Sequence, residues 1–539
     1  MVARIAVLLA AIALLTGAGP PPRDQLDNGI WAGLLHLGGA ATYVTVAFPK
    51  AAAADDPQGD LYFPERSEVG LPLSGLSRDG RNLAFQARYV AVTYRFTGAI
   101  EGTAMRGSLR AGPHAAGTFE LHHLIRLDAA QLEPFVGTYR APDRDVMVAR
   151  PYTYVMFLDT KTGRMGFLWP SRPDTFVTGP SKGIHFPFIA TFRFTRDASG
   201  GVRAVDVAFA KGTAIHATRV PSFRSRPLDF ANGAATLRGT FFLPDGNPPF
   251  PAVMLLAGSN YQTRSAQNAF LSWVGDVFLK HGFAVYAYDK RGADFSTGER
   301  SDGFVVADAV KGFEAMARQP EVRPSCMGIW GISQGGMAAP KVAATTSGVT
   351  FIANTSGAVV NGNVQEVQRT ALEMRADGFS ESEIADAVRL QTLKFDYAMT
   401  GRGWDEYIAA YRAYEHRTWF PDPYVGPPSD PKSPAFAFWA QEGDTAPADY
   451  WKQFHGQALY IDGEHETNQD RAANFDAFVG AMKAAGNTTY ETEVVPGADH
   501  SMLIDPRGGN TIDRLLTNFA MSYFSSLERW IDTIACAKR

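Results

Sequence analysis

Ser333 is the residue of this sequence whose setting most favours nucleophilic chemistry. It is the serine of a Gly-x-Ser-x-Gly segment at 331–335, with a short apolar run before it at 327–330 and a helix-like stretch after it. Such a sharp strand-to-helix turn predicts a strained backbone at the serine, with the hydroxyl projecting above the sheet edge. With 52 glycines in 539 residues the five-residue pattern alone is weak, so the prediction depends on partners further along the chain.

A serine hydroxyl needs a base within hydrogen-bond reach and a third group that orients this base. In an open parallel sheet such groups lie in loops at the C-terminal ends of strands. His500 lies in such a loop, after a strand-like segment at 493–495, and we predict that it is the base. His465 also follows a strand-like segment and is the alternative.

The orienting acid is predicted in the loop after the next-to-last strand. A carboxylate there can hold an imidazole whether it comes from Asp or Glu. Glu466 is our prediction, and Asp462 and Asp470 are the alternatives. The order Ser333, Glu466, His500 favours Glu466, because nucleophile, acid and base follow this order along the chain in α/β-hydrolases.

Backbone N–H groups must hold the oxyanion of a tetrahedral intermediate. Gln334, directly after Ser333, is predicted to give one of them. The other is predicted from the loop after the apolar segment 251–256, where Ser259 is the first choice and Asn260 the second. A plain glycine turn in this loop is compatible with the same residues.

From residue 228 onward, apolar segments alternate with helix-like stretches, which is the pattern of βαβ units around a parallel sheet. The segment 251–256 is continuously apolar, as expected of a strand covered on both faces. A helical stretch and a proline-rich segment interrupt this alternation, so we predict a helical cap at about 361–456 within a catalytic domain at 228–539. A peripheral helical decoration is the alternative for the insertion.

The first half of the chain is rich in short strand-like segments separated by glycine. Residues 92–97 alternate apolar and polar side chains, the period-2 pattern of a half-buried strand. We predict an antiparallel β-barrel or sandwich domain at 27–125, a second β-rich domain at 126–222 and a linker at 221–227. Neither block holds a cluster of titratable residues at a useful spacing.

The N-terminus has the features of a secretory signal peptide, predicted at 1–19. Arg4 precedes an apolar run at 5–15 that is short for a membrane span, and small residues follow the run. An uncleaved N-terminal anchor is the alternative, and no later segment is apolar enough over its length to cross a membrane. We therefore expect an exported protein, periplasmic or secreted, with no stable membrane span after cleavage.

The chain has two cysteines, Cys326 and Cys536. Export would place them where a disulfide can persist. A large domain does not need a disulfide, however, so two free or buried thiols are the expectation.

Composition narrows the classes of partner. The formal net charge is −4, and no long run of one sign occurs, which argues against a nucleic-acid partner. No metal and no cofactor are expected, because the sequence has no H-E-x-x-H, paired C-x-x-C or P-loop. The oligomeric state does not follow from the sequence.

The motifs between 228 and 539 together resemble the α/β-hydrolase superfamily, and within it bacterial exported esterases related to the serine aminopeptidase and dienelactone-hydrolase-like groups. The matching segments are PAVMLLAGSN at 251–260, YDKRG at 288–292, GISQGG at 331–336, GEHE at 463–466 and GADH at 497–500. Two positions depart from the family pattern: Ala257 stands where the family usually has His, and Glu466 where it usually has Asp.

The resemblance implies a serine hydrolase that cleaves small-molecule carboxylic esters through an acyl-enzyme with a Ser-His-Glu triad. A serine aminopeptidase or a thioesterase of the same fold is one alternative. A peptidase would need a cap carboxylate to bind the substrate amine, and the available ones are Glu366, Glu373, Glu381 and Glu383. The other alternative is a catalytically silent protein whose β domains bind a cell-envelope component.

Overall fold

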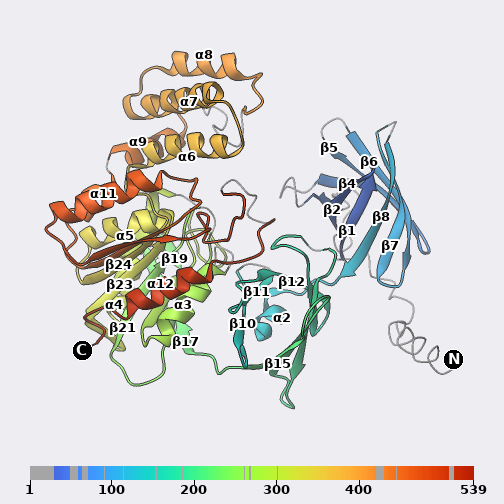
Figure 1. The fold of residues 1–539 in the computed structure, drawn as a ribbon, viewed down its shortest axis with the longest axis horizontal. Coiled ribbons are helices and arrows are strands. Elements are labelled where there is room, and N and C mark those ends of the chain that lie inside the picture. Colours follow the sequence, from blue (N-terminus) through green and yellow to red (C-terminus); the bar gives the residue numbers. More distant parts are fainter. Residues whose placement is uncertain are drawn as a thin grey trace.

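The computed structural model describes residues 29–48, 59–63, 71–89, 92–112, 115–151, 154–184, 186–259, 262–265, 269–299, 302–420, 430–444, 446–508 and 515–538. The signal peptide predicted at 1–19 lies outside these residues. Two all-β units are followed along the chain by a larger α/β unit that carries a helical insertion (Figure 1).

The first unit, barrel 1, is a closed antiparallel barrel of eight strands in chain order. The strands are β1 (Ile30–Leu37), β2 (Ala40–Ala47), β3 (Asp60–Tyr62), β4 (Leu71–Asp79), β5 (Asn82–Tyr89), β6 (Val92–Glu101), β7 (Ala104–Ala111) and β8 (Ala115–Leu124). Its interior is filled by apolar side chains that include Trp31, Phe85 and Phe96. The alternative of a sandwich is therefore not realised in this unit.

The second unit, barrel 2, is also a closed antiparallel barrel, in which β9 pairs with β10 and β16. Its elements are α2 (Ala129–Leu132), η1 (Glu133–Phe135), β9 (Gly137–Ala141), β10 (Arg144–Ala149), β11 (Val155–Asp159), β12 (Met165–Arg172), β13 (Thr175–Thr178), β14 (Ala190–Arg196), β15 (Val202–Phe209) and β16 (Ile215–Arg219). The two barrels meet where Ala32, Leu124 and Val177 form a shared apolar cluster.

The α/β part (residues 224–538) is built on one eight-stranded sheet in the order β17-β20-β22-β21-β23-β24-β25-β26. The strands are β17 (Arg224–Pro227), β20 (Gly239–Leu243), β21 (Phe250–Leu256), β22 (Ala284–Tyr288), β23 (Val322–Ile332), β24 (Val349–Thr355), β25 (Gln457–Gly463) and β26 (Tyr490–Val495). A separate hairpin pairs β18 (Phe230–Asn232) with β19 (Ala235–Leu237). The prediction of a linker at 221–227 is wrong in part, because β17 pairs with β20 along the sheet edge.

The strand directions identify the fold. β17, β20 and β22 pair antiparallel, whereas every pairing from β22 to β26 is parallel. A mostly parallel sheet with one inversion of order, at β22 and β21, and with a strand–Ser–helix turn after β23 is the α/β-hydrolase fold. The α/β fold class predicted from residue 228 onward is confirmed.

Helices cover both faces of this sheet (Figure 1). On one face α3 (Phe270–Lys280) and α12 (Met521–Ile531) bury aromatic side chains such as Phe270 and Tyr523. On the other face lie α4 (Val305–Ala317), preceded by η2 (Asp302–Phe304), then α5 (Gln334–Thr345) and α11 (Arg471–Ala484).

A helical insertion separates β24 from β25. Its helices are α6 (Gly362–Ala376), α7 (Glu381–Thr400), α8 (Trp404–Tyr414), α9 (Pro434–Asp444) and α10 (Pro447–Trp451). Most of it has a core of its own, formed by residues such as Met374, Leu390 and Tyr407, and Figure 1 shows α6, α7 and α8 stacked beyond the sheet. None of the helices that the structure describes is long and apolar enough to cross a membrane.

Barrel 2 shares a buried apolar cluster with the α/β part, in which Met147, Leu158 and Met165 join residues of α3 and α12, and hydrogen bonds at two loops add to this contact. After β21, the Thr263 hydroxyl donates to the carbonyl oxygen of Pro151 (2.7 Å), and the Ser265 hydroxyl donates to that of Arg150 (2.8 Å). Near the C-terminus, residues 515–520 run beside barrel 2, where the Phe519 N–H donates to the Gly163 carbonyl (2.7 Å). The last helix, α12, therefore begins only at Met521, because the residues before it pair with barrel 2.

The expectation of two free thiols is also wrong. Cys326 in β23 and Cys536 after α12 form a disulfide, with Cα atoms 5.3 Å apart and a separation of 210 positions along the chain. The bond joins the β23 strand of the sheet to the segment that follows the last helix.

Candidate active site

Ser333 occupies the turn between β23 and α5 in a conformation that L-residues rarely adopt, with φ 53° and ψ −123°. Its N–H donates to the Thr355 carbonyl of the neighbouring strand (2.9 Å), which fixes the turn against β24. The turn has no room for side chains at its glycines: a Cβ on Gly335 would lie 2.3 Å from the Leu256 carbonyl oxygen. The strain at Ser333 is thus imposed by close packing of strand and helix.

Glu466 and His500 come together from adjacent strand ends. Glu466 follows β25 and His500 follows β26, and the Nδ1 atom of His500 lies 2.7 Å from a carboxylate oxygen of Glu466. The Glu466 side chain is fully buried, and 17% of the His500 side chain is exposed. A carboxylate at Nδ1 selects the tautomer with a proton there, so Nε2 is left as an acceptor for a proton.

Glu466 is held by three further donors, one of which is the backbone N–H of Thr467. The backbone N–H of Asn468 donates to its other oxygen (2.5 Å), and the buried carboxyl of Asp462 is hydrogen-bonded to it. Burial and the nearby Glu466 raise the pKa of Asp462 well above its usual range, so that Asp462 is the acid that keeps a proton. Burial raises the pKa of Glu466 to about 8, against the effect of these hydrogen bonds.

Asp462 was one alternative for the orienting acid, and the structure places it behind Glu466. It is fully buried and accepts hydrogen bonds from the Gln469 side chain (2.9 Å) and the Gly463 N–H (3.0 Å). Asp470, the other alternative, accepts the N–H of Ala473 (3.0 Å) as the N-cap of α11.

His465, the alternative base, is occupied elsewhere. Its Nδ1 lies 2.8 Å from the Asp505 carbonyl oxygen, and its N–H donates to the Ala498 carbonyl. These contacts tie the loop after β25 to the loop that carries His500, so His465 has a structural role in the arrangement.

The residues predicted to hold the oxyanion come from two different segments of the chain. Gln334 is the first residue of α5, and Ser259 is an exposed residue of the loop after β21. The third candidate, Asn260, lies outside the described residues. Lys290, for which the sequence predicted no role, connects the two segments. Its ammonium donates to the Gln334 side-chain oxygen (2.7 Å) and to the Gly258 carbonyl (3.0 Å).

Helix α6 of the insertion lies against the acid loop. Gln365 donates through its amide to the Asn468 carbonyl, and the Asp470 N–H donates to Gln368 (3.3 Å). Along the same helix Arg369 is paired with Glu366 (2.8 Å) and Glu373 (2.9 Å).

Charged side chains of α6 also affect the pKa of His500. Burial lowers the pKa of His500; Asp499 and Glu373 act to raise it, and Arg369 acts to lower it. The insertion therefore contributes to the electrostatics of the base, although it lies far from β26 along the chain.

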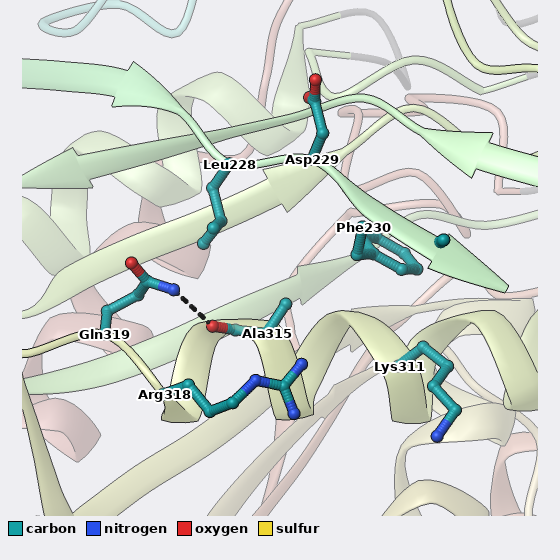
Figure 2. Close-up of a pocket in the computed structure, with 8 residues that line it drawn as sticks. Leu228, Asp229, Phe230, Lys311, Ala315, Arg318 and Gln319 are labelled. Atoms are coloured by element: carbon teal, nitrogen blue, oxygen red, sulfur yellow. Dashed lines mark hydrogen bonds between the residues drawn. The ribbon is translucent and has the colours of Figure 1, made fainter.

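A separate surface hollow of about 250 Å³ lies between the start of the α/β part and α4. Figure 2 shows Leu228 and Phe230 above α4, with Lys311 and Arg318 projecting from the helix. None of its lining residues is a predicted site residue, so this hollow is distinct from the arrangement around His500.

Comparison with known proteins gives weak likenesses. No protein-family model matches the chain. The thiohydrolase aneE of Aspergillus aculeatus is 28% identical over 107 residues, which make up 19% of this chain and about a third (32%) of that protein.

Solved structures align over 57% to 58% of the chain. The Pyrococcus furiosus esterase PF2001 is 14% identical with a TM-score of 0.37 and covers 58% of this chain and 91% of its own. Est1E of Butyrivibrio proteoclasticus, with ferulic acid bound, is 13% identical with a TM-score of 0.37, over 57% and 99% of the two chains. At these values the likenesses say nothing about a substrate, and the fold assignment rests on the strand order of this chain.

Proposed function

We propose that the protein is a serine hydrolase that cleaves carboxylic esters through an acyl-enzyme, with Ser333 as nucleophile, His500 as base and Glu466 as orienting acid. The observation that carries the proposal is the 2.7 Å contact between His500 Nδ1 and the buried Glu466 carboxylate, at the same sheet edge as the strained turn of Ser333. Strain at a sharp turn and a buried carboxylate behind a histidine are both costly to maintain without a use.

In the first half of the reaction the Ser333 oxygen attacks the ester carbonyl carbon, and its proton passes to Nε2 of His500. The negative charge that forms on the carbonyl oxygen is held by the N–H groups of Gln334 and Ser259. When the intermediate collapses, the carbon–oxygen bond to the alcohol breaks, and His500 returns its proton to the leaving alcohol.

In the second half, water attacks the acyl group on Ser333. His500 takes a proton from this water and then returns it to the serine oxygen as the carboxylic acid departs. Glu466 stabilises the imidazolium in both halves, because its carboxylate accepts the Nδ1 proton throughout.

The carboxylates on α6 and α7 favour an ester over a peptide with a free amine. Glu366 and Glu373 both pair with Arg369, Glu381 pairs with Arg375, and Glu383 caps α7 at Ser380. An aminopeptidase would need one of these groups to meet the substrate amine, and each is already engaged in the helices.

A thioester is the second candidate substrate. The relative from Aspergillus aculeatus that aligns with part of this chain is named a thiohydrolase, and the proposed steps apply unchanged when the leaving group is a thiol. The bond between the acyl carbon and sulfur would then break in place of the carbon–oxygen bond, with the His500 proton going to the sulfur of the leaving thiol.

We propose in addition that the protein is exported to the periplasm or secreted. Two observations support this: the signal-like segment predicted at 1–19, and the disulfide between Cys326 and Cys536. Disulfides persist in oxidising compartments and are rare in the cytosol.

The test is labelling by a fluorophosphonate probe, which reacts with activated serines. Wild type and a Ser356→Ala variant should be labelled, and Ser333→Ala should not. Ser356 is a matched control, because like Ser333 it is a serine with positive φ directly after a strand, and its side chain is buried. Short p-nitrophenyl esters, S-acyl thioesters and aminoacyl-p-nitroanilides assayed in parallel decide the substrate class.

Turnover of esters with no turnover of anilides supports the proposal, and preference for thioesters by more than tenfold in kcat/KM selects the second candidate. Anilide turnover would make the protein a peptidase. A wild type that is not labelled would remove Ser333 as a nucleophile and leave the silent, envelope-binding alternative.

A further inference from the structure

Lys290 lies at the centre of the predicted oxyanion region although no step of the proposed mechanism uses it. It follows β22, and its backbone is fixed by hydrogen bonds to Gln262 (3.0 Å) and from Ala293 (2.9 Å). The preceding residue, Asp289, is fully buried and paired with Arg264, so the start of this loop is anchored in the protein.

The Lys290 ammonium spans three neighbouring strand ends. In the sheet, β22 lies beside β21 and β21 beside β23. From the end of β22 the ammonium reaches the Gly258 carbonyl after β21 (3.0 Å) and the Gln334 side chain at the start of α5 (2.7 Å). The contacts join residues that are 32 and 44 positions apart, so no local structure would hold these groups together.

The contact with Gly258 determines the direction of the next N–H. Carbonyl oxygen and amide hydrogen of one trans peptide unit point in opposite directions, and the unit is planar. Because Lys290 holds the Gly258 carbonyl, the N–H of Ser259 is directed to the side away from the ammonium. A peptide that is free to rotate would lose this direction.

The contact with Gln334 fixes the other donor. The side chain of Gln334 is held by Lys290, and its backbone N–H belongs to the first turn of α5, which lies directly against the end of β21 at Gly335. A single ammonium therefore bonds Gln334 and the peptide unit that carries the Ser259 N–H. Its charge also lies beside the region where negative charge develops.

We propose that Lys290 is a positioning residue of the oxyanion hole: it orients the Ser259 N–H through the Gly258 carbonyl and fixes Gln334 through the side-chain amide. The inference rests on the proposed function, since it assigns no reaction of its own. It predicts that removing the ammonium weakens binding of the tetrahedral state far more than binding of the substrate.

The test compares Lys290→Met with wild type in three measurements: kcat and KM for p-nitrophenyl butyrate, and the inhibition constant of an alkylboronic acid that forms a tetrahedral adduct on the serine. We expect kcat to fall about tenfold to a hundredfold, somewhat less than loss of a donor itself, with KM within about threefold of wild type. The affinity for the boronic acid should fall by the same factor as kcat.

Three further variants guard against a folding defect. Gln334→Met removes the side-chain oxygen that Lys290 contacts but keeps the backbone N–H, and should show part of the same loss. The double variant should then lose less than the product of the two single effects, because both act through one contact. Lys311→Met is the matched control, since Lys311 is an exposed lysine of α4 paired with Glu314, and should leave all three measurements unchanged.

The outcomes separate the two proposals. If wild type is labelled by fluorophosphonate and Lys290→Met binds the boronic acid as tightly as wild type does, the positioning role is wrong and the serine hydrolase stands. A fall in kcat with a matching rise in KM and unchanged boronic acid affinity also overturns it. If wild type itself is not labelled, the proposed function fails first.

Discussion

The two barrels and the α/β part are stabilised in different ways. Among the described residues, all five non-glycine positions with positive φ lie in the α/β part, at Ala269, Asp294, Ser333, Ser356 and Met502. Of the buried carboxyl groups in the described chain, Asp159 alone belongs to a barrel. The barrels are closed sheets around aromatic and aliphatic cores, whereas the α/β part keeps strain and buried charge near its strand ends.

This difference separates residues that hold the fold from residues that hold the site. Strained backbone and buried carboxyl groups cost free energy, on the order of 1–3 kcal/mol for each strained residue. Ser333, Ser356 and Met502 lie beside the ends of β23, β24 and β26, where the proposed triad is assembled. We therefore expect changes in the barrels to alter stability with little effect on turnover, and changes at the strand ends to do the reverse.

The largest effect on stability is expected from the disulfide, which the α/β part has and the barrels lack among the described residues. Replacing both cysteines, Cys326→Ala with Cys536→Ala, opens a loop of 210 residues. Loop-closure entropy gives a loss of up to about 5 kcal/mol in the free energy of unfolding. Thermal denaturation followed by calorimetry measures it, and fluorophosphonate labelling below the transition should be retained.

Reduction of wild type by dithiothreitol is the control, and should lower the melting temperature as the double variant does. The double variant should then be insensitive to dithiothreitol. A melting temperature within 2 °C of wild type would mean that packing of α12 alone holds the C-terminus to β23.

A comparable loss is expected from the core of barrel 1, but without loss of activity. Phe96 is fully buried, stacked on Phe85 with ring centres 4.6 Å apart and edge-on to Phe119. Phe96→Ala should cost about 3–5 kcal/mol in the free energy of unfolding of barrel 1. We expect kcat/KM for a short ester to stay within about twofold of wild type below the transition.

A fall in kcat/KM of tenfold or more in the folded Phe96→Ala protein would contradict the expectation that barrel residues affect stability and not turnover. We expect no such fall, because barrel 1 contacts the rest of the chain chiefly through barrel 2. Phe96→Leu, which retains most of the buried apolar volume, should restore much of the stability without changing turnover.

A smaller effect, confined to the pH dependence, is expected at Asp462. Glu466 must be ionised to stabilise the imidazolium, and its pKa is raised, so kcat/KM should rise with pH through about 8. The hydrogen bond from Asp462 lowers the pKa of Glu466, so Asp462→Ala should move this rise to higher pH. For each unit of the shift, activity at pH 7 falls about tenfold.

Asp462→Asn is the control for Asp462→Ala. An asparagine amide can donate to Glu466 as a protonated Asp462 does, so the profile should stay within about half a pH unit of wild type. If Asp462 carried the charge in the native protein, Asp462→Asn would instead shift the rise strongly to lower pH, since a buried negative neighbour would be removed.

The sequence predicted those parts of the structure that depend on residues close to one another along the chain. The turn at Ser333 and the alternation of strands and helices depend on residues within a few positions of one another, and the α/β fold follows from them. The pairing of Cys326 with Cys536 depends on where the end of α12 packs, which no spacing in the sequence encodes. The same reason hid the contacts of Lys290, although it lies in a segment that carried the family resemblance.

The β-rich half shows the same limit. Period-2 alternation predicted strands, but barrel and sandwich share that pattern, and closure is decided by pairing of the first strand with the last. In barrel 1 that pairing joins β1 to β8, with Gly33 opposite Leu121 and no room for a Cβ at the glycine. Residues 515–520 show this limit as well, because their partners in barrel 2, at Gly163 and Arg164, are not indicated by any residue near them in the sequence.

The smallest effect on stability and turnover is expected at the contact between barrel 2 and the loop after β21. Thr263 is buried in the loop after β21, and its hydroxyl donates to the Pro151 carbonyl of barrel 2 (2.7 Å). Thr263→Val keeps the shape and removes the donor, at a cost of about 1 kcal/mol in the free energy of unfolding. Because the same loop carries Ser259, we expect kcat to fall about twofold to fivefold with KM unchanged.

Ser265→Ala is the matched variant, since Ser265 makes the neighbouring hydroxyl bond to Arg150 (2.8 Å) in the same loop. If barrel 2 supports the oxyanion loop, the two variants should lower kcat and the affinity for the boronic acid together, as Lys290→Met does to a greater extent. If barrel 2 is only attached to the α/β part, both variants should lower the melting temperature slightly and leave kcat as in wild type. That result would extend the separation of fold and site to the surface between them. The loop after β21 would then be positioned by contacts within the α/β part, such as those of Lys290 and the Arg264–Asp289 pair.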